Sequence, residues 1–440
     1  MNRSAVGAAR SALPSLTGMR FLAAALVFVS HVAGNRIFAD DATNNWFFDV
    51  FNPAGWLGVG FFFILSGFVL TWSARENDTV RGFWRRRLAK IFPNHLVTWI
   101  AGLLLMVATG EALNAWYAVP SAFLVHTWIP RMDALTGTNG PSWSLCCELV
   151  FYLSFPYVYR LVKRIRPARL WAWIIATVVA IAAWAGFVYV ALPKEPEIIW
   201  APMPFWHFFA IYNPPPVRML DFLLGILLAR AVITGRWIRI GWPAATVAMV
   251  AGYAAMVVVP PEFGMMAVTA APLGMLIATA AVSDIDGTRS PFRGRTMIWL
   301  GEVSFAFYMV HYLVLHFSLK LIGDRVGWTV PQGLAVAAIL MALTLWVAHL
   351  IYRHVEIPAM RHFGRARNSR GTPTTARLTP APEPGRPTIP VQRTATAYMA
   401  PCDPAAKNAP TRGAPLITPC EPALQCTHTP ACEPGEPART

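Results

Sequence analysis

Apolar runs long enough to cross a lipid bilayer recur along this chain from about residue 20 to residue 352. A membrane-spanning helix needs about 20 mostly apolar residues. The pattern predicts ten such helices, over residues 20–38, 55–73, 91–109, 143–162, 169–192, 218–235, 241–259, 265–283, 297–319 and 332–352. The stretch 114–130 is apolar but short and contains two prolines, so we expect a re-entrant or interfacial segment there. The predicted fold is an all-α integral membrane protein.

Positively charged residues gather in every second loop between these runs. The loop 74–90 contains six Lys or Arg residues and the segment 160–169 contains five, whereas 39–54 contains none. Two further basic groups are Arg230, Arg236 and Arg239, and Arg289, Arg293 and Arg295. Because cytoplasmic loops carry an excess of Lys and Arg, the pattern predicts a multi-pass protein of the cell membrane with both termini in the cytoplasm.

The pattern also divides the chain into three parts. Residues 1–15 are expected to be a short cytoplasmic N-terminal segment, and residues 16–360 a single membrane domain. From residue 364 on, large apolar residues become few and periodicity disappears, while the last 70 residues contain 15 of the 37 prolines. We expect 364–440 to be a Pro-rich, disordered cytoplasmic tail.

Composition supports a membrane domain. The chain is 55% hydrophobic and only 13% charged, where soluble domains carry about 25% charged residues. The net charge of +15 would suggest nucleic acid as a partner of a soluble protein, but here the basic residues lie between spans, so we expect the lipid bilayer and no nucleic acid. Cys146 and Cys147 are expected as buried thiols. The tail cysteines match no standard zinc spacing, so we expect no metal.

Ionisable residues inside membrane spans are costly and usually functional. Arg20 and His31 are eleven residues apart, which is three helical turns and about 16 Å along one helix face. Arg20 is expected at the cytoplasmic edge, so His31 would lie near the middle of the bilayer. An imidazole there can take a proton from a hydroxyl. The alternative is a histidine that only bonds neighbouring helices together.

Glu148 is the second such residue. Trp143 marks the outer end of its predicted span, and Glu148 lies five residues deeper, towards the depth of His31. A buried carboxylate needs a partner, and we expect it to orient the imidazole and stabilise its charged form, with Ser144 one turn away. The alternative is a structural ion pair.

The basic run FWRRRLAKIFP opens the third predicted span. Its charges serve topology first, but Arg87 and Lys90 lie three apart on one face and suit phosphate binding, together with Arg85 and Arg86. Two further pairs share a helix face and suit either a cavity or packing: Arg218 with Asp221, and Tyr308 with His311.

In this order, the motifs resemble the membrane-bound acyltransferase family 3 over about residues 13–360. LPSLTGMRFLAAALVFVSH is similar to the Arg-x10-His signature of that family, and GVGFFFILSGFVL to its glycine-rich second helix. FWRRRLAKIFP resembles its RxxR-I-x-P segment, with Lys90 where the family usually has a second Arg. SWSLCCELVFYLSFP resembles its WSLxxE-x-x-FY motif. RMLDFLLGILLA, GEVSFAFYMVH and HVEIPAMR resemble later blocks.

The resemblance implies an enzyme that moves an acyl group, expected to be acetyl, from acyl-CoA to a hydroxyl, with no permanently bound cofactor. The implied acceptor is a sugar or a natural product. The opening LPSLTGMRF is most similar to the branch that acylates macrolide antibiotics; surface polysaccharides and lipid-linked sugars are alternatives. The expected catalytic residues are His31 as general base, Glu148 and Arg20. Arg85, Arg86, Arg87 and Lys90 are expected to bind the donor, and direct transfer and a covalent acyl-histidine both remain open.

A proton-coupled transporter or flippase is the alternative from another class. Ten helices with intramembrane His, Glu and Arg also suit a carrier. Against it, the two halves of the chain show no internal repeat. A non-catalytic receptor would have little need of a basic cluster in line with a histidine at mid-membrane.

Overall fold

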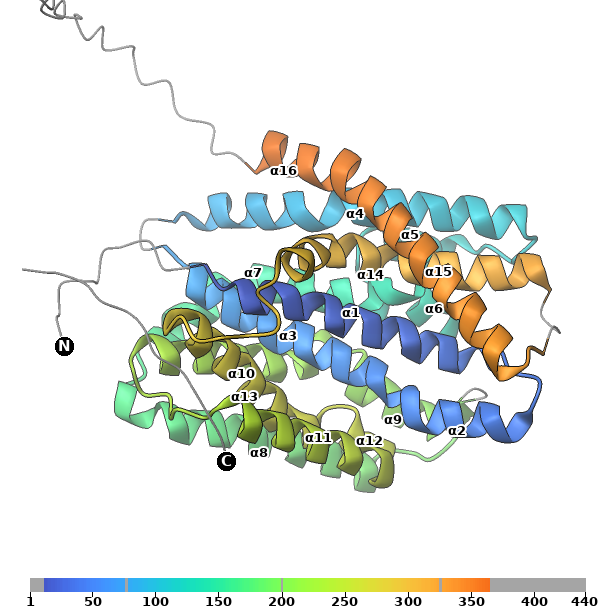
Figure 1. Ribbon diagram of the computed structural model, residues 1–440. Helices are drawn as coiled ribbons and strands as arrows, with labels where there is room; N and C mark the ends of the chain where they lie inside the picture. The colour runs from blue at the N-terminus through green and yellow to red at the C-terminus, as the bar shows by residue number, and fades with distance from the viewer. Residues whose placement is uncertain (1–11, 76–77, 199–200, 324–326, 365–440) are drawn as a thin grey trace, which may run out of the picture. The chain divides into compact units, whose positions relative to one another are not determined.

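The computed structural model describes residues 12–75, 78–198, 201–323 and 327–364, and the membrane domain forms one bundle of helices (Figure 1). The first eleven residues of the predicted N-terminal segment and residues 365–440 of the predicted tail lie outside the described residues.

The long helices of the bundle are α1 Pro14–Gly34, α3 Pro53–Ser73, α4 Val80–Ala108, α7 Trp143–Lys163, α8 Leu170–Ala191, α10 Pro215–Ile233, α11 Trp242–Val258, α13 Ala267–Ile285, α14 Arg295–Ile322 and α15 Val330–Ile351. Shorter helices are α2 Asp41–Phe51, α5 Ala115–Ala122, α6 Met132–Thr136, α9 Phe205–Tyr212, α12 Pro261–Gly264 and α16 Ile357–Phe363. The remaining elements are the 3-10 turns η2 His126–Trp128, η3 Gly140–Ser142 and η4 Pro167–Arg169, the π-helix η5 Tyr352–Glu356, and the antiparallel strands β1 Glu197–Ile198 and β2 Ala201–Pro204.

Each of the ten predicted spans corresponds to one long helix. Eight of the described helical segments are long and apolar enough to cross a membrane. Of the other two predicted spans, α11 is a shorter apolar helix, and α10 contains three charged residues. The chain is therefore an all-helical multi-pass membrane protein apart from the short β1–β2 ladder, while the count of ten spans stays a prediction. The segment predicted to be re-entrant forms only α5 and η2, which are too short to span.

Helix α4 differs most from its prediction, because it begins at Val80 rather than near residue 91. The basic run itself is helical: Thr79 caps the helix by accepting a hydrogen bond from the Gly82 amide, and the long Arg and Leu side chains that follow are good helix formers. Arg87 and Lys90 therefore project from a helix and not from a loop.

The bundle is held together by close helix crossings at glycines. A Cβ on Gly225 of α10 would lie 1.9 Å from the carbonyl oxygen of Ile64 in α3, and a Cβ on Gly67 of α3 would lie 2.0 Å from that of Phe222. Gly301 of α14 lies equally close to α1, where a Cβ would be 1.8 Å from the Thr17 oxygen. Small residues let membrane helices approach in this way, and these crossings fix α3 against α10 and α14 against α1.

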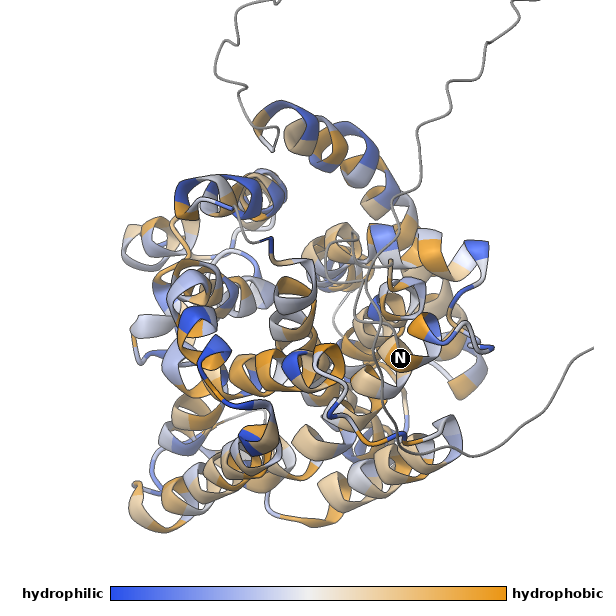
Figure 2. Ribbon diagram, turned by 90° about the vertical axis from the view of Figure 1, so that its left-hand side faces the viewer, coloured by the Kyte–Doolittle hydropathy of each residue, from blue (hydrophilic) through white to orange (hydrophobic). Residues whose placement is uncertain are grey.

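The outer face of the bundle is apolar. Val190 of α8, Val258 of α11 and Leu104 of α4 have 82%, 81% and 65% of their surface exposed, as expected of side chains that face lipid. Figure 2 looks along the helices from the end at which α1 and α4 begin, and apolar residues cover much of the helix walls. Both ends of the described chain lie at this same end of the bundle (Figure 1).

Candidate active site

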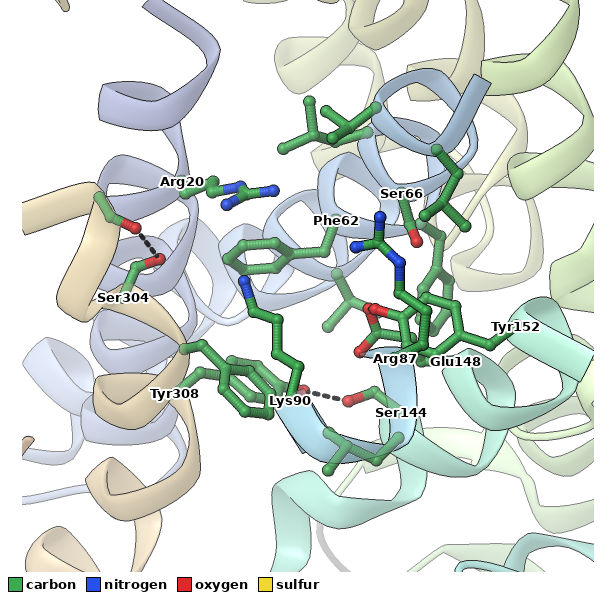
Figure 3. Close-up of a pocket in the computed structure, with 18 of the residues that line it drawn as sticks. Arg20, Phe62, Ser66, Arg87, Lys90, Ser144, Glu148, Tyr152, Ser304 and Tyr308 are labelled. Carbon is green, nitrogen blue, oxygen red and sulfur yellow. Dashed lines mark hydrogen bonds between the residues drawn. The ribbon is translucent and has the colours of Figure 1, made fainter. Parts of the chain in front are cut away.

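A pocket lies among α1, α3, α4, α7 and α14 (Figure 3). All five helices contribute to its polar lining, which includes Arg20, Ser66, Arg87, Lys90, Ser144, Glu148, Tyr152, Glu302, Ser304 and Tyr308. It lies toward the end of the bundle where α1 and α4 begin. A charged pocket inside an apolar bundle is costly and marks a site that binds polar ligand groups.

Three cations face this pocket from two helices. Arg20 comes from α1, and Arg87 and Lys90 come from one face of α4. In Figure 3 the Lys90 ammonium points across the pocket towards the Arg20 side of the bundle. The Arg87 guanidinium lies 5.6 Å from the ring centre of Phe83 and 5.9 Å from that of Tyr152. The structure therefore brings Arg20 together with two members of the predicted donor-binding run, Arg87 and Lys90, and this cluster suits an anionic ligand.

The other two members of the predicted donor-binding run lie elsewhere. Arg85 and Arg86 do not line this pocket. Arg86 instead forms an ion pair with Asp78 just before α4. Because α4 is already helical here, successive side chains point in different directions. Of the four basic residues predicted to bind the donor, only Arg87 and Lys90 therefore face the pocket.

Glu148 lies in the pocket but not where the sequence suggested. Its carboxylate accepts a hydrogen bond from Tyr152, four residues on, and its electrostatic neighbours are Lys90, Arg20 and Arg87. Among the described residues no hydrogen bond or ion pair joins Glu148 to His31. The expected carboxylate–imidazole couple is thus replaced by a carboxylate–cation cluster, since Glu148 faces α4 and the start of α1 across the pocket.

His31 lies outside the lining of the pocket. Its ring is half-buried and stacks on His311 of α14, with ring centres 5.1 Å apart and planes at 13°. Tyr312 meets it edge-on at 5.3 Å. His311 is fully buried, and its Nδ1 lies 2.6 Å from the carbonyl oxygen of Tyr308. The two histidines, from helices that were predicted separately, form one imidazole stack.

Tyr308 connects the pocket to this stack. Its hydroxyl lies 2.8 Å from Ser144 Oγ, which also donates to the carbonyl oxygen of Pro141. The Tyr308 ring lies 5.6 Å from that of His311 and 5.8 Å from that of Phe62. Ser144 and Tyr308, predicted as supporting residues, are therefore brought together in the pocket wall.

The remaining predicted residues support the wall from behind. Arg218 and Asp221 form a buried ion pair at 2.9 Å, and the Arg218 guanidinium lies 5.0 Å from the ring centre of Phe63, which lines the pocket. Trp143 packs edge-on against the same Phe63 ring at 6.0 Å. None of the three predicted residues lines the pocket.

Glu356 is a residue that the sequence reasoning missed. It lies in the π-helix η5, where Asn94 of α4 donates to its carboxylate at 2.8 Å. A second pocket beside the first is lined by Glu356 together with Arg20, Lys90 and Glu302. The block HVEIPAMR pointed to this region, but the hydropathy pattern gave no sign that the helix continues past the last span and packs against α4 there. One-turn π-helices are frequent at functional sites.

Comparison with known proteins decides what kind of site this is. The profile of the acyltransferase domain family (Acyl_transf_3) matches residues 13–353. This chain belongs to that family. The acyltransferase is 40% identical to the acyltransferase MdmB of Streptomyces mycarofaciens, over 81% of its own length and 93% of the relative.

More distant relatives share the same region. Nodulation protein 10 of Rhizobium leguminosarum is 29% identical to the acyltransferase over 39% of this chain and 49% of the relative. The peptidoglycan O-acetyltransferase OatA of Listeria monocytogenes is 24% identical over 50% of this chain and 34% of the relative. No solved structure matches the acyltransferase. Together these similarities establish a membrane O-acyltransferase, an enzyme that transfers an acyl group from a donor to a hydroxyl-bearing acceptor.

Proposed function

We propose that this O-acyltransferase transfers an acetyl group from acetyl-CoA to a hydroxyl of a natural product of the macrolide type, with His31 as general base. The observation that carries the proposal is the charged pocket. Three cations from α1 and α4 converge there, and Coenzyme A carries several phosphates for which such a cluster is the expected partner. Arg20, Arg87 and Lys90 would bind these phosphates, and Glu148 would hold the three cations in place.

The transfer itself needs a base. His31 would remove the proton from the acceptor hydroxyl, and the oxygen would form a bond to the thioester carbonyl carbon. The carbon–sulfur bond then breaks, and the imidazolium returns its proton to the Coenzyme A thiolate. No further reactant is required. A base with the half-buried environment of His31 can exchange a proton with substrate in this way.

The acceptor class rests on the extent of the similarity. The similarity to MdmB covers 81% of this chain and nearly all of that relative, whereas OatA is matched over a third of its length. The greater likeness to MdmB supports a diffusible natural product over a polymer as acceptor. We further propose that the pocket opens towards the cytoplasm, because the basic loops of the sequence lie at that end.

The direct test uses the full-length protein purified in detergent with radiolabelled acetyl-CoA. Acceptors would be a macrolide with free hydroxyls, a free hexose and a lipid-linked sugar, and the product would be identified as an ester by mass spectrometry. Acetylation of the macrolide is the expected result. Acetylation of only the lipid-linked sugar would contradict the acceptor assignment, and the same result with propionyl-CoA alone would contradict the donor assignment.

A further inference from the structure

The wall between the pocket and the imidazole stack is held by the Tyr308 hydroxyl, which bonds to Ser144 and, over a longer distance of 3.4 Å, to the Pro141 carbonyl oxygen. Tyr308 of α14 and Ser144 of α7 line the pocket, and their hydroxyl oxygens lie 2.8 Å apart (Figure 3). Both residues are buried, with 6% of each exposed. The Phe62 ring of α3 meets the Tyr308 ring edge-on and extends the wall. Three helices thus contribute to one closed surface.

The proposed base lies beyond this wall. His311 follows Tyr308 by one helical turn and contacts the Tyr308 ring. His31 in turn stacks on the His311 ring. Neither histidine is among the residues that line the pocket. A thioester held by Arg20, Arg87 and Lys90 would therefore have the Tyr308 side chain between itself and His31.

The stack itself is ready to receive a hydroxyl. The carbonyl oxygen of Tyr308 can only accept, so His311 must carry its proton on Nδ1. Its Nε2 is then an acceptor, and this atom is buried without a hydrogen-bond partner among the described residues. A buried polar atom without a partner points to a ligand or water that completes it.

We propose that Tyr308 and Ser144 form a gate that separates the donor pocket from the His31–His311 stack until an acceptor is bound. The proposal rests on the proposed function. An acceptor hydroxyl replaces the bond between the two side chains, Tyr308 turns aside, and the thioester carbonyl reaches the base. In the absence of acceptor, the closed gate protects the thioester, because water next to both the base and the carbonyl would hydrolyse it.

The reaction that the gate prevents is simple hydrolysis. Water gives a proton to His31 and its oxygen forms a bond to the carbonyl carbon. The carbon–sulfur bond breaks, and the products are acetate and the free thiol of Coenzyme A, which takes the proton back. The thiol released without acceptor therefore reports how often the gate is open.

The experiment measures thiol release from acetyl-CoA with and without acceptor, using the full chain in detergent. Tyr308→Phe and Ser144→Ala each remove the hydrogen bond between Ser144 and Tyr308, and both variants keep an aromatic ring at position 308. We expect each variant to raise acceptor-free hydrolysis about three- to tenfold, the population shift expected from one lost hydrogen bond. Tyr308→Phe also removes the longer bond to the Pro141 carbonyl oxygen, so its effect should equal or exceed that of Ser144→Ala. Because both variants remove the Ser144–Tyr308 bond, the double variant should raise hydrolysis no further than Tyr308→Phe alone.

Two matched controls remove comparable bonds elsewhere. Tyr253→Phe deletes a hydroxyl that donates to the Val50 carbonyl oxygen at 2.6 Å, and Ser154→Ala deletes one that donates to Phe151 in the same helix as Ser144. Neither should change acceptor-free hydrolysis. If the two gate variants lose transfer without any rise in hydrolysis, Tyr308 contacts the reacting atoms directly and the gate is refuted. If the wild-type protein forms no ester with any acceptor, the proposed function fails first, which separates the two failures.

Discussion

The charged pocket and the imidazole stack share two helices, α1 and α14, yet they differ in kind. Arg20 and His31 both belong to α1, and Tyr308 and His311 both belong to α14. In the pocket, the negative charge of Glu148 lies close to the positive charges of Arg20, Arg87 and Lys90. In the stack, two rings meet face to face, and no carboxylate contacts them among the described residues.

The difference teaches how one bundle can bind an anion and also hold a base. A group of cations next to an imidazole would oppose its protonation, and would weaken it as a proton acceptor. Three helical turns along α1 separate the two tasks. The first three variants below test this division between pocket and stack, and the fourth probes a polar cluster outside both; they are ordered from the largest expected effect to the smallest.

Replacing the proposed base should have the largest effect. His31→Ala is expected to lower the rate of ester formation about 10²- to 10⁴-fold, the usual contribution of general base catalysis, while the binding of acetyl-CoA stays the same. Rates would be measured at saturating donor and acceptor, and binding by equilibrium titration of the detergent-purified protein. Near wild-type turnover would break the comparison, since the stack would then have no chemical task.

Replacing a pocket cation should change donor affinity instead. Arg87→Ala is expected to raise KM for acetyl-CoA about tenfold, because a charge-assisted bond to phosphate is lost, with a smaller change in KM for the acceptor. Arg86→Ala is the matched control, because Arg86 is already paired with Asp78 outside the pocket lining. Equal effects of the two variants would mean that the run serves topology alone.

Removing the negative charge of Glu356 should strengthen binding of the acyl donor. Glu356 lines the second pocket together with Arg20 and Lys90, so it competes with an incoming phosphate for the same cations. Glu356→Gln keeps an oxygen for the bond from Asn94 and is expected to lower KM for acetyl-CoA about two- to threefold. An increase in KM would show that Glu356 positions the cations rather than competing for them.

The smallest effect is expected far from both regions. Glu111 follows α4 and accepts hydrogen bonds from Lys320 at 2.6 Å and from His316 at 3.0 Å. Although burial acts to raise it, these bonds lower the pKa of the Glu111 carboxyl. A lowered pKa stabilises the fold above the free value of about 4.3, and this contribution is lost as pH falls below it.

Thermal unfolding in detergent from pH 7 to pH 3 measures this contribution. Wild type should melt about 2 °C above Glu111→Gln near neutral pH, and the gap should close below about pH 4. Asp133→Asn, which removes an exposed pair with Arg131, is the control and should leave the melting temperature unchanged. A gap that widens in acid would contradict the assigned sign.

The spans were predictable because the bilayer imposes one requirement on every helix. Long apolar runs located α3 and α7 almost to the residue. The start of α4 was missed, because a hydropathy pattern counts its arginines against a helix although they favour one. In the site, charge and spacing singled out Arg20, Lys90 and Glu148, since ionisable residues inside apolar runs are visible in one dimension.

The wall between pocket and stack was not predictable. It depends on how α14 is rotated against α7, which places Tyr308 rather than His311 on the pocket side. Close packing at Gly301 fixes α14 against α1, and no periodicity along the chain reports how α14 is turned towards α7. Glu356 was missed for a similar reason, because a π-helix after the last span changes the direction in which its carboxylate points.

The crossing at Gly301 also limits how this enzyme can be redesigned. Any side chain there would meet the Thr17 carbonyl oxygen, which is backbone and cannot rotate away. Even alanine would force apart α1 and α14, the helices that carry Arg20 and Tyr308. To make room for longer acyl chains, smaller residues should therefore replace side chains that line the pocket, such as Phe62 or Phe305. The crossing of α1 and α14 at Gly301 should be left unchanged.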